Sequence, residues 1–291
     1  MPSFKPAREY EGIFPLVKLP LAAEKTDIFN VARRKKSSDR AIANNRMPAH
    51  GTGEPAAEPL VPLVNCPVCS GGRFHEQTVL WPELIAEWDL APEEARYIDQ
   101  QQGFACLDCG NNLRAMTLAA AITRAFQHAG SLRELCLADA RFRALRLLEI
   151  NSAGELTPIF QFLPHHSLVA FPQFDMQSMN LPDDAVEIIV HSDTLEHVPD
   201  PVQALRECRR VLKAGGHLFY TIPVVIGRLT RSRTGLPPSY HGTRAAGAVD
   251  DYRVQTEYGA NFWCELFAAG FDNVTLTSLI FPASVAICAR K

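Results

Sequence analysis

The sequence predicts an α/β fold built on a parallel sheet, and three neighbouring segments carry this prediction. Residues 185–191 form a short apolar run rich in Val and Ile, which is typical of a strand buried on both faces. An Asp-Pro pair at 200–201 favours the start of a helix, which we expect the Lys-Ala-Gly-Gly turn at 213–216 to close. Residues 217–222 then supply a second apolar strand. Strand, helix and strand within so short a span indicate a right-handed crossover.

Polar residues follow the first of these strands, where we expect a loop. They are Ser192, Asp193, Glu196 and His197. Ligands of open α/β sheets bind at the carboxyl ends of the strands, so this loop is a candidate binding site.

The sequence of residues 175–223 resembles the second half of a class I S-adenosylmethionine (SAM) methyltransferase. The resemblance rests on the stretches LPDDAVEIIVHSDTLEHVPDP and RRVLKAGG, in which Ala214 stands where the family usually has proline. It implies a Rossmann-like methyltransferase sheet with helices on both faces, and SAM as the cofactor. The alternative is a generic crossover unit from another nucleotide-binding fold.

The first half of the cofactor site is expected at residues 145–155, in LRLLEINSAGE. The family has a strand that ends in a carboxylate, followed by a glycine-rich turn that lets backbone approach the cofactor. Glu149 stands at the acidic position, but only the displaced Gly154 remains of the glycines. Asn tolerates a positive φ better than most residues, so Asn151 still permits the turn. The resemblance implies cofactor contacts at Glu149, Asn151, Ser152 and Gly154.

The next segment is shorter than in the family. There is room for one helix near 155–163 and one strand near 167–171, where the family normally has two strands and a further helix. The carboxylate that usually holds the ribose hydroxyls is missing. Asp175 and Met176 resemble the pair that borders the adenine, although Asp175 also suits a simple surface turn. His191 and Ser192 complete the predicted cofactor contacts.

Three residues are candidates for the chemistry. His197 is the first candidate base, because an imidazole titrates near neutral pH; the alternative is that it only braces its loop. His241 is the second candidate. Asp193 either orients the substrate or the cofactor amine, or caps the turn.

Cysteine spacing predicts a second module. Two Cys-x-x-Cys pairs provide four ligands for a structural zinc ion, and the alternatives are a disulfide pair or free thiols. The predicted ligands are Cys66, Cys69, Cys106 and Cys109. Between the pairs lies a helix-like segment with Trp81 and Trp88, and residues 113–126 predict a helix that leads into the next domain. Asn111 or Asn112 is expected to cap this helix, and Ser131 is expected to cap a second helix at 132–138.

Three regions follow from these patterns. We expect a basic tail and linker at 1–62, a zinc-ribbon-like module with a connecting helix at 63–127, and the methyltransferase domain at 128–291. That domain is expected to contain an amphipathic helix at 258–269 and, as the resemblance implies, a closing antiparallel pair of strands at 274–279 and 284–289. With 29 basic and 32 acidic residues, the net charge of −3 gives no general attraction to nucleic acid or membrane. No apolar run is long enough to span a membrane, and we expect a cytoplasmic protein.

The long segment at 224–251 is expected to cover the acceptor. Arg228, Arg231 and Arg233 either clamp an anionic acceptor or form a solvated basic loop. The predicted function is methyl transfer to a small polar acceptor, such as a sugar, polysaccharide or secondary-metabolite intermediate. Two alternatives remain, namely a scaffold protein that has lost the cofactor and a zinc-ribbon protein that binds nucleic acid, which the lack of interleaved aromatic and basic residues does not favour.

Overall fold

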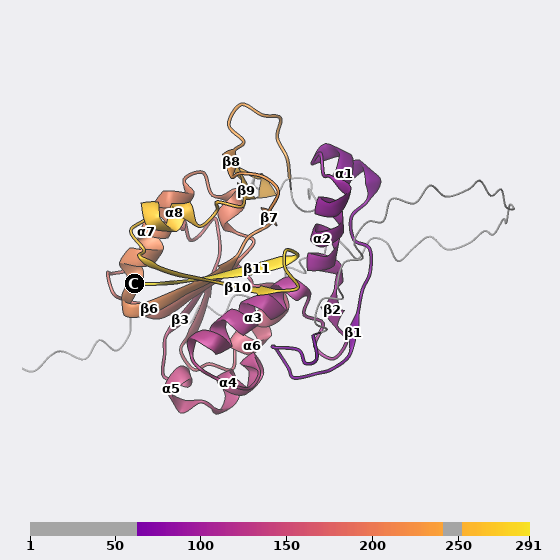
Figure 1. Ribbon diagram of the computed structural model, residues 1–291. Coiled ribbons are helices and arrows are strands. Elements are labelled where there is room, and N and C mark those ends of the chain that lie inside the picture. Colours follow the sequence, from indigo (N-terminus) through magenta and orange to yellow (C-terminus); the bar gives the residue numbers. More distant parts are fainter. Residues whose placement is uncertain (1–62, 241–251) are drawn as a thin grey trace, which may run out of the picture. The chain divides into compact units, whose positions relative to one another are not determined.

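The computed structural model describes residues 63–240 and 252–291, and its largest element is a six-stranded sheet (Figure 1). The strand order is β10-β11-β6-β5-β3-β4. The strands are β3 (Leu147–Ile150), β4 (His166–Val169), β5 (Val186–Ser192), β6 (Leu212–Thr221), β10 (Asn273–Leu279) and β11 (Ser284–Arg290). Strands β4, β3, β5 and β6 are parallel, whereas β11 pairs antiparallel with both β6 and β10. The predicted parallel sheet with a closing antiparallel pair is confirmed.

Helices cover both faces of this sheet (Figure 1). The helices concerned are α3 (Leu113–Ala125), α4 (Leu132–Ala138), α5 (Ala140–Arg143), α6 (Thr157–Phe160), α7 (Pro201–Val211) and α8 (Cys264–Ala268). One core contains residues of α3 and α4 together with Val190 and Phe219, and the other contains residues of α7 and α8 together with Ile189 and Tyr220. Neighbouring residues of one strand thus enter opposite cores, as the period of a strand requires. The predicted Rossmann-like architecture is confirmed.

Local sequence signals fix where three of these helices begin. The Asn112 side chain accepts a hydrogen bond from the backbone N–H of Ala115 at 3.0 Å, and Asp200 accepts one from Gln203 at 2.9 Å. Ser131 caps α4 in the same way, through a reciprocal pair of bonds with Glu134. Each cap satisfies a backbone donor that the first turn of a helix leaves without a partner.

The segment between β3 and β5 is as short as the sequence predicted. It holds a 3₁₀ turn (η2, Gly154–Leu156), helix α6 and the single strand β4. The turn after β3 is therefore separated from the motif around β5 by one strand and one helix fewer than the resemblance implies.

Two element boundaries differ from the prediction. The turn at 213–216 lies within β6, where the register with β5 shifts between Val186 and Ile188. The helix expected at 258–269 is shorter, because its first residues belong to strand β9 (Thr256–Gly259). This strand pairs with β7 (Val224–Val225) and β8 (Arg231–Ser232). At Gly259 a Cβ would lie 2.2 Å from the carbonyl oxygen of Arg228, so this close pairing of the backbones requires glycine there. A long-range strand contact has overridden the helical pattern.

The cysteine module combines a two-stranded antiparallel sheet with two helices. They are β1 (Phe74–His75), β2 (Ala105–Cys106), α1 (Pro82–Glu87) and α2 (Pro92–Gly103). The sequence indicated one helix in this insertion, and α2 was not predicted. Cys66, Val68 and Cys106 belong to the same buried core as Val190 and Phe219 of the sheet. The division into regions at 62 and 127 stays a prediction.

Among residues 63–240 and 252–291, no helix is long and apolar enough to cross a membrane.

Candidate functional site

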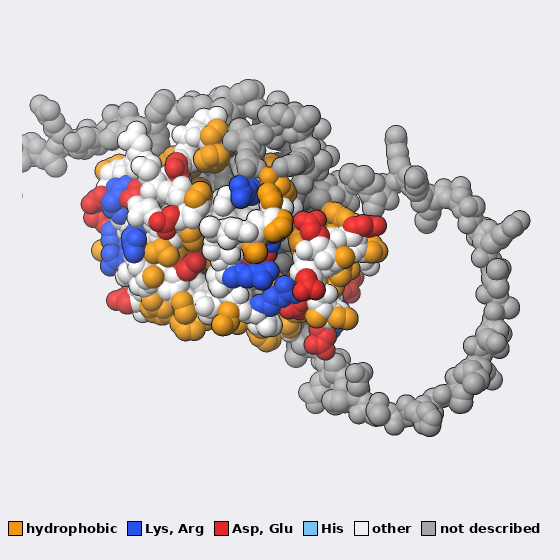
Figure 2. Space-filling model, turned by 90° about the horizontal axis from the view of Figure 1, so that it is seen from above, with side chains coloured by type: hydrophobic (Ala, Val, Ile, Leu, Met, Phe, Trp, Pro, Cys, Tyr) orange, Lys and Arg blue, Asp and Glu red, His pale blue; other side chains and the backbone are white. Residues whose placement is uncertain are grey.

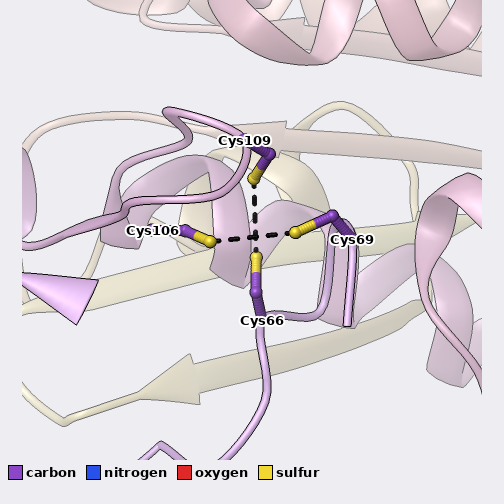
Figure 3. A group of neighbouring side chains, drawn as sticks. All are labelled: Cys66, Cys69, Cys106 and Cys109. Carbon is purple, nitrogen blue, oxygen red and sulfur yellow. Dashed lines mark hydrogen bonds between the residues drawn. The ribbon is translucent and has the colours of Figure 1, made fainter. Parts of the chain in front are cut away.

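The side chains of four cysteines point toward one another (Figure 3). Their sulfur atoms all lie within 4.8 Å of one another, with Sγ–Sγ distances of 3.7 Å for both Cys66–Cys109 and Cys69–Cys106. Four thiolates placed about 2.3 Å from a tetrahedral zinc ion would lie about 3.8 Å apart. The predicted set of four cysteines is therefore brought together at distances that fit zinc.

The chain also donates hydrogen bonds to these sulfurs. The backbone N–H of Gly71 donates to Cys69 Sγ at 3.4 Å, and the amide of Asn111 donates to Cys109 Sγ at 3.5 Å. The hydrogen bond with Cys66 lowers the pKa of the Cys109 thiol to about 5, and the same bond raises the pKa of Cys66. Donors of this kind stabilise thiolates, which are the form that binds metal.

The turn after β3 adopts the shape that the sequence left in doubt. Asn151 has a φ of 57° and Gly154 a φ of 65°, so both occupy the left-handed region. A Cβ at Gly154 would meet no atom within 4 Å, which leaves its backbone open to a ligand. Asn151 and one glycine thus produce the sharp turn that the family makes with several glycines.

Glu149, at the end of β3, is fully buried, and its carboxylate holds this turn together. One oxygen accepts from the backbone N–H of Ala153 at 2.7 Å and from the hydroxyl of Thr157 at 2.5 Å. The other lies 2.7 Å from the ring Nε2 of His166, on β4. Both oxygens therefore have protein partners.

Asn151 joins the carboxyl ends of three strands. Its amide donates to the hydroxyl of Thr194, beyond β5, at 3.3 Å, and its oxygen accepts from the backbone N–H of Phe171, beyond β4, at 3.2 Å. Ser152 is hydrogen-bonded to Thr157 at 2.9 Å within the same turn. The predicted cofactor contacts after β3 thus lie at the edge where β4 and β5 also end.

The segment after β4 supplies the other predicted contacts. Asp175 accepts from the backbone N–H of Gln177 at 2.8 Å, the bond of a local turn, and Met176 is buried. The sequence has no acidic residue at 168–172, where the resemblance implies the carboxylate that holds the ribose. The adenine contact of Asp175 stays a prediction, and its turn role is visible.

The two predicted contacts at the end of β5 have different surroundings. His191 is fully buried, its ring stacks on Tyr220 with centroids 4.7 Å apart, and neither ring nitrogen has a hydrogen-bond partner among the described residues. Burial lowers the pKa of His191 to about 3, so this imidazole is neutral in the folded protein. The Ser192 hydroxyl is hydrogen-bonded to that of Thr221 at 2.8 Å.

Asp193 is held by the helix that follows the cysteine module. Its carboxylate forms an ion pair with Arg114 of α3, and its backbone has a positive φ of 46°. The backbone N–H of Asp193 donates to the carbonyl of Thr221 at 3.0 Å. These contacts fix the direction in which the chain leaves β5.

Glu196 and His197 belong to the Leu-Glu-His turn (η3, Leu195–His197), and their side chains lie close together. His197 Nδ1 is 3.1 Å from the carbonyl oxygen of Arg253, and its Nε2 is 3.6 Å from the carboxylate of Glu196. Glu196 is buried, and neither of its oxygens has a hydrogen-bond partner in the part of the chain that the structure describes. Burial raises the pKa of Glu196, and the nearby His197 lowers it by less. The other candidate base, His241, lies outside the described residues.

A cavity of about 350 Å³ opens beside this turn. The apolar residues of its wall are Trp88, Leu90, Ile98, Pro223, Val224, Val225, Leu229 and Val254, and the residues with polar groups are Glu196, Arg228, Arg231, Arg233, Ser239, Thr256, Glu257 and Tyr258. One side comes from the insertion between the cysteine pairs, and the other comes from the segments after β5 and β6. The carboxyl edge of the sheet thus continues from the predicted cofactor residues into a partly open, mostly apolar cavity.

The three arginines of the segment after β6 have acidic partners within the chain. Arg228 pairs with Glu94 of α2, whereas Arg231 and Arg233 both pair with Glu257 of β9. Figure 2 shows basic and acidic side chains intermixed on the face it draws, rather than a separate basic patch. The arginines therefore hold the insertion and the strands together, and each has an acidic partner, although Arg231 and Arg233 share Glu257.

Comparison with known proteins identifies the central part of the chain. Residues 119–220 match a family model described as a methyltransferase domain. An uncharacterized methyltransferase of Mycobacterium leprae is 29% identical over 117 residues, which are 39% of this chain and 44% of that protein. A ubiquinone biosynthesis O-methyltransferase of Vibrio parahaemolyticus is 23% identical over 159 residues, or 51% of this chain and 60% of that protein. The chain thus spans about half the length of these curated relatives.

Among solved structures, a SAM-dependent methyltransferase of Thermotoga maritima, described as a possible histamine N-methyltransferase, is 15% identical with a TM-score of 0.36. The alignment covers 62% of this chain and 90% of that one. The fold assignment rests on the strand order, not on this likeness. The matched segment contains β3, β4, β5 and β6, so the resemblance to class I methyltransferases is confirmed for this part of the chain.

Sequence reasoning missed several residues of the site. Thr157 and His166 hold Glu149, and Arg114 holds Asp193, through contacts between residues far apart in the sequence that no motif announces. Glu196 was visible as an acidic residue in the Leu-Glu-His turn, but nothing in the sequence showed that it would be buried against a cavity.

Proposed function

We propose that this protein transfers a methyl group from SAM to a small-molecule acceptor. The observation that carries the proposal is the match of residues 119–220 to the methyltransferase domain, together with the turn geometry within that segment. Asn151 and Gly154 give the turn after β3 the left-handed backbone that the family obtains from glycines. SAM supplies a methyl group that its sulfonium has already activated, so the protein mainly has to position the acceptor.

The proposed cofactor site lies along the carboxyl ends of β3, β4 and β5. Its members are Glu149, Asn151, Ser152, Gly154, Asp175, Met176, His191 and Ser192. Glu149 would act mainly by holding the turn, since its oxygens already accept bonds from Ala153 and Thr157. His197 is the proposed base, and the Arg253 carbonyl orients its ring. Asp193 is the proposed orienting residue, held by Arg114.

Zinc is the proposed occupant of the cysteine cluster, in a structural role. The support is the close approach of the four sulfurs, all within 4.8 Å of one another, and the hydrogen bonds that Cys69 and Cys109 receive. With four protein ligands the site has no open position for a substrate, so its effect is on folding. We expect about one zinc ion per chain by elemental analysis.

The sequence favoured a polar, sugar-derived or anionic acceptor. The ion pairs of Arg228, Arg231 and Arg233 and the apolar cavity wall now favour a less polar one. The two alternatives, a scaffold protein without the cofactor and a zinc protein that binds nucleic acid, are not favoured by the family match.

Thermal unfolding with added ligand tests the cofactor proposal. A ligand at 100 times its dissociation constant stabilises the folded state by about 2.7 kcal/mol. We expect SAM and S-adenosylhomocysteine to raise Tm and ATP, which shares the adenosine, to leave it unchanged. A protein that none of the three stabilises would return the scaffold alternative.

A further inference from the structure

The cavity beside the Leu-Glu-His turn has a mostly apolar surface and four buried residues with polar groups, namely Glu196, Ser239, Thr256 and Tyr258. Eight apolar side chains line it, and the arginines and Glu257 on its border are already ion-paired with one another or with Glu94. The Glu196 carboxylate faces the His197 ring at 3.6 Å, which is beyond hydrogen-bond distance. Glu196 is 1% exposed, and both its oxygens are without a hydrogen-bond partner among the described residues.

A buried carboxyl group with no hydrogen bonds destabilises the folded state, because it has lost its hydration without gaining a partner. Folded proteins rarely leave such a group unsatisfied, and where they do a ligand or an ordered molecule often completes it. His197 Nε2 lies 3.6 Å from the Glu196 carboxylate, and the other ring nitrogen faces the Arg253 carbonyl. Glu196 therefore has bonding capacity that points to a ligand in the cavity.

The size and position of the cavity restrict that ligand. A volume of about 350 Å³ lies at the low end of the range for small-molecule sites. The wall formed by Trp88, Leu90 and Ile98 comes from the insertion between the two cysteine pairs, and Arg228 binds this insertion through Glu94 and through the carbonyl oxygens of Trp88 and Asp89. The insertion therefore contributes part of the binding surface as well as packing.

We propose that this cavity binds the methyl acceptor as a mostly apolar molecule with one hydroxyl or amine group, which forms a hydrogen bond with Glu196. The apolar body of the acceptor lies against Ile98 and its neighbours, and the polar group faces the carboxyl edge of β5. The role as acceptor site rests on the proposed methyltransferase function. A sugar is disfavoured as the acceptor, because its several hydroxyls need more hydrogen-bond partners than a mostly apolar cavity surface offers.

Binding of matched probes to the full-length, zinc-loaded protein tests this inference, with saturation-transfer NMR as the readout. The probes are 4-ethylphenol, 4-ethyltoluene, which replaces the hydroxyl by a methyl group, and methyl α-D-glucoside. We expect 4-ethylphenol to bind at least about tenfold more tightly than 4-ethyltoluene, since one hydrogen bond to a buried group is worth about that factor. The glucoside should not bind.

Two variants assign the effect to residues. Glu196→Leu should abolish the preference for the phenol, and Ile98→Trp should fill the cavity and weaken both aromatic probes at least tenfold. Glu93→Leu, on the exposed side of α2, is the matched control and should bind like the wild type. If Glu196→Leu does not fold, Ile98→Trp still decides whether the probe occupies this cavity.

The inference is overturned if the glucoside binds in place of the phenol, if the preference survives Glu196→Leu, or if Ile98→Trp binds 4-ethylphenol like the wild type. SAM binding is measured on the same samples. If SAM fails to bind while the probe results hold, the methyltransferase proposal fails and the cavity stands as a ligand site of other purpose.

Discussion

The cysteine cluster and the turn after β3 acquire their geometry in different ways. In the cluster, two short repeats place Cys66 with Cys69 and Cys106 with Cys109, and the fold has only to bring two pairs together. The turn has only Gly154 of the several glycines that the resemblance implies. Its shape depends on Asn151 and on hydrogen bonds from Glu149 to partners on other elements. A site that depends on residue spacing can be recognised in the sequence as a motif, whereas a site that depends on long-range contacts cannot.

Removing a cysteine should have the largest effect of the changes considered. Cys106→Ser removes one of four ligands, and a structural zinc site supplies much of the folding free energy of its module. We expect the zinc content to fall from about one to near zero per chain and the stability to drop by at least about 5 kcal/mol. Elemental analysis and denaturant unfolding provide the measurement.

Cys264→Ser is the control for this change, because Cys264 is exposed and lies outside the cluster. It should retain zinc and stability. A Cys106→Ser protein that kept both would show that the cluster is not a structural metal site.

Breaking the turn after β3 should have the next largest effect. Glu149→Ala leaves the N–H of Ala153, the hydroxyl of Thr157 and the ring of His166 without their buried acceptor, which we expect to cost about 3 kcal/mol. Urea unfolding measures this cost. The exposed neighbour Glu155→Ala should change stability by less than about 0.5 kcal/mol, and equal costs for the two would contradict the role given to Glu149.

The buried imidazole of β5 should make stability depend on pH. His191 has a pKa of about 3 in the folded protein against 6.5 ordinarily, so the unfolded chain takes up its proton first as the pH falls. Its contribution is complete above about pH 6.5 and is lost as the pH falls toward 3. Between pH 7 and pH 5 the wild type should lose about 2 kcal/mol relative to His191→Phe, which keeps the ring against Tyr220.

Urea unfolding of both proteins at the two pH values measures this difference. His165→Phe, at an exposed histidine, should show the same pH dependence as the wild type. Parallel curves for wild type and His191→Phe would mean that the His191 imidazole is hydrated or protonated in the folded protein.

The smallest effect is expected on the border of the cavity. Arg231 is 58% exposed and shares Glu257 with Arg233. Arg231→Gln should therefore change stability by less than about 1 kcal/mol, as is usual for surface ion pairs. Affinity for an anionic probe such as inorganic phosphate should not change either. A large loss of phosphate binding on calorimetric titration would restore the anion clamp as a function of this segment.

The sequence predicted the parts of the fold that depend on local patterns. The helix caps at Asn112, Ser131 and Asp200 are where they were expected. So are the two strands around α7 and the single strand between α6 and β5. It failed at Tyr258 because pairing with β7 is a contact across the chain, and at α2 because that helix has few apolar residues to mark it.

The candidate site divides in the same way. Spacing identified the four cysteines, and resemblance identified the turn. By contrast, the ion pair of Asp193 with Arg114 and the burial of Glu196 depend on how α3 and the insertion pack against the sheet. The predicted roles of the cofactor and catalytic residues stay predictions until a ligand is bound.

Calorimetric titration of the zinc-loaded protein with SAM and S-adenosylhomocysteine tests the central claim most directly, with Glu149→Ala measured alongside. The account predicts saturable binding of both ligands by the wild type, with one site per chain, and a loss of binding of at least tenfold in the variant. No heat of binding from either ligand in a folded, zinc-loaded wild type would contradict the methyltransferase function.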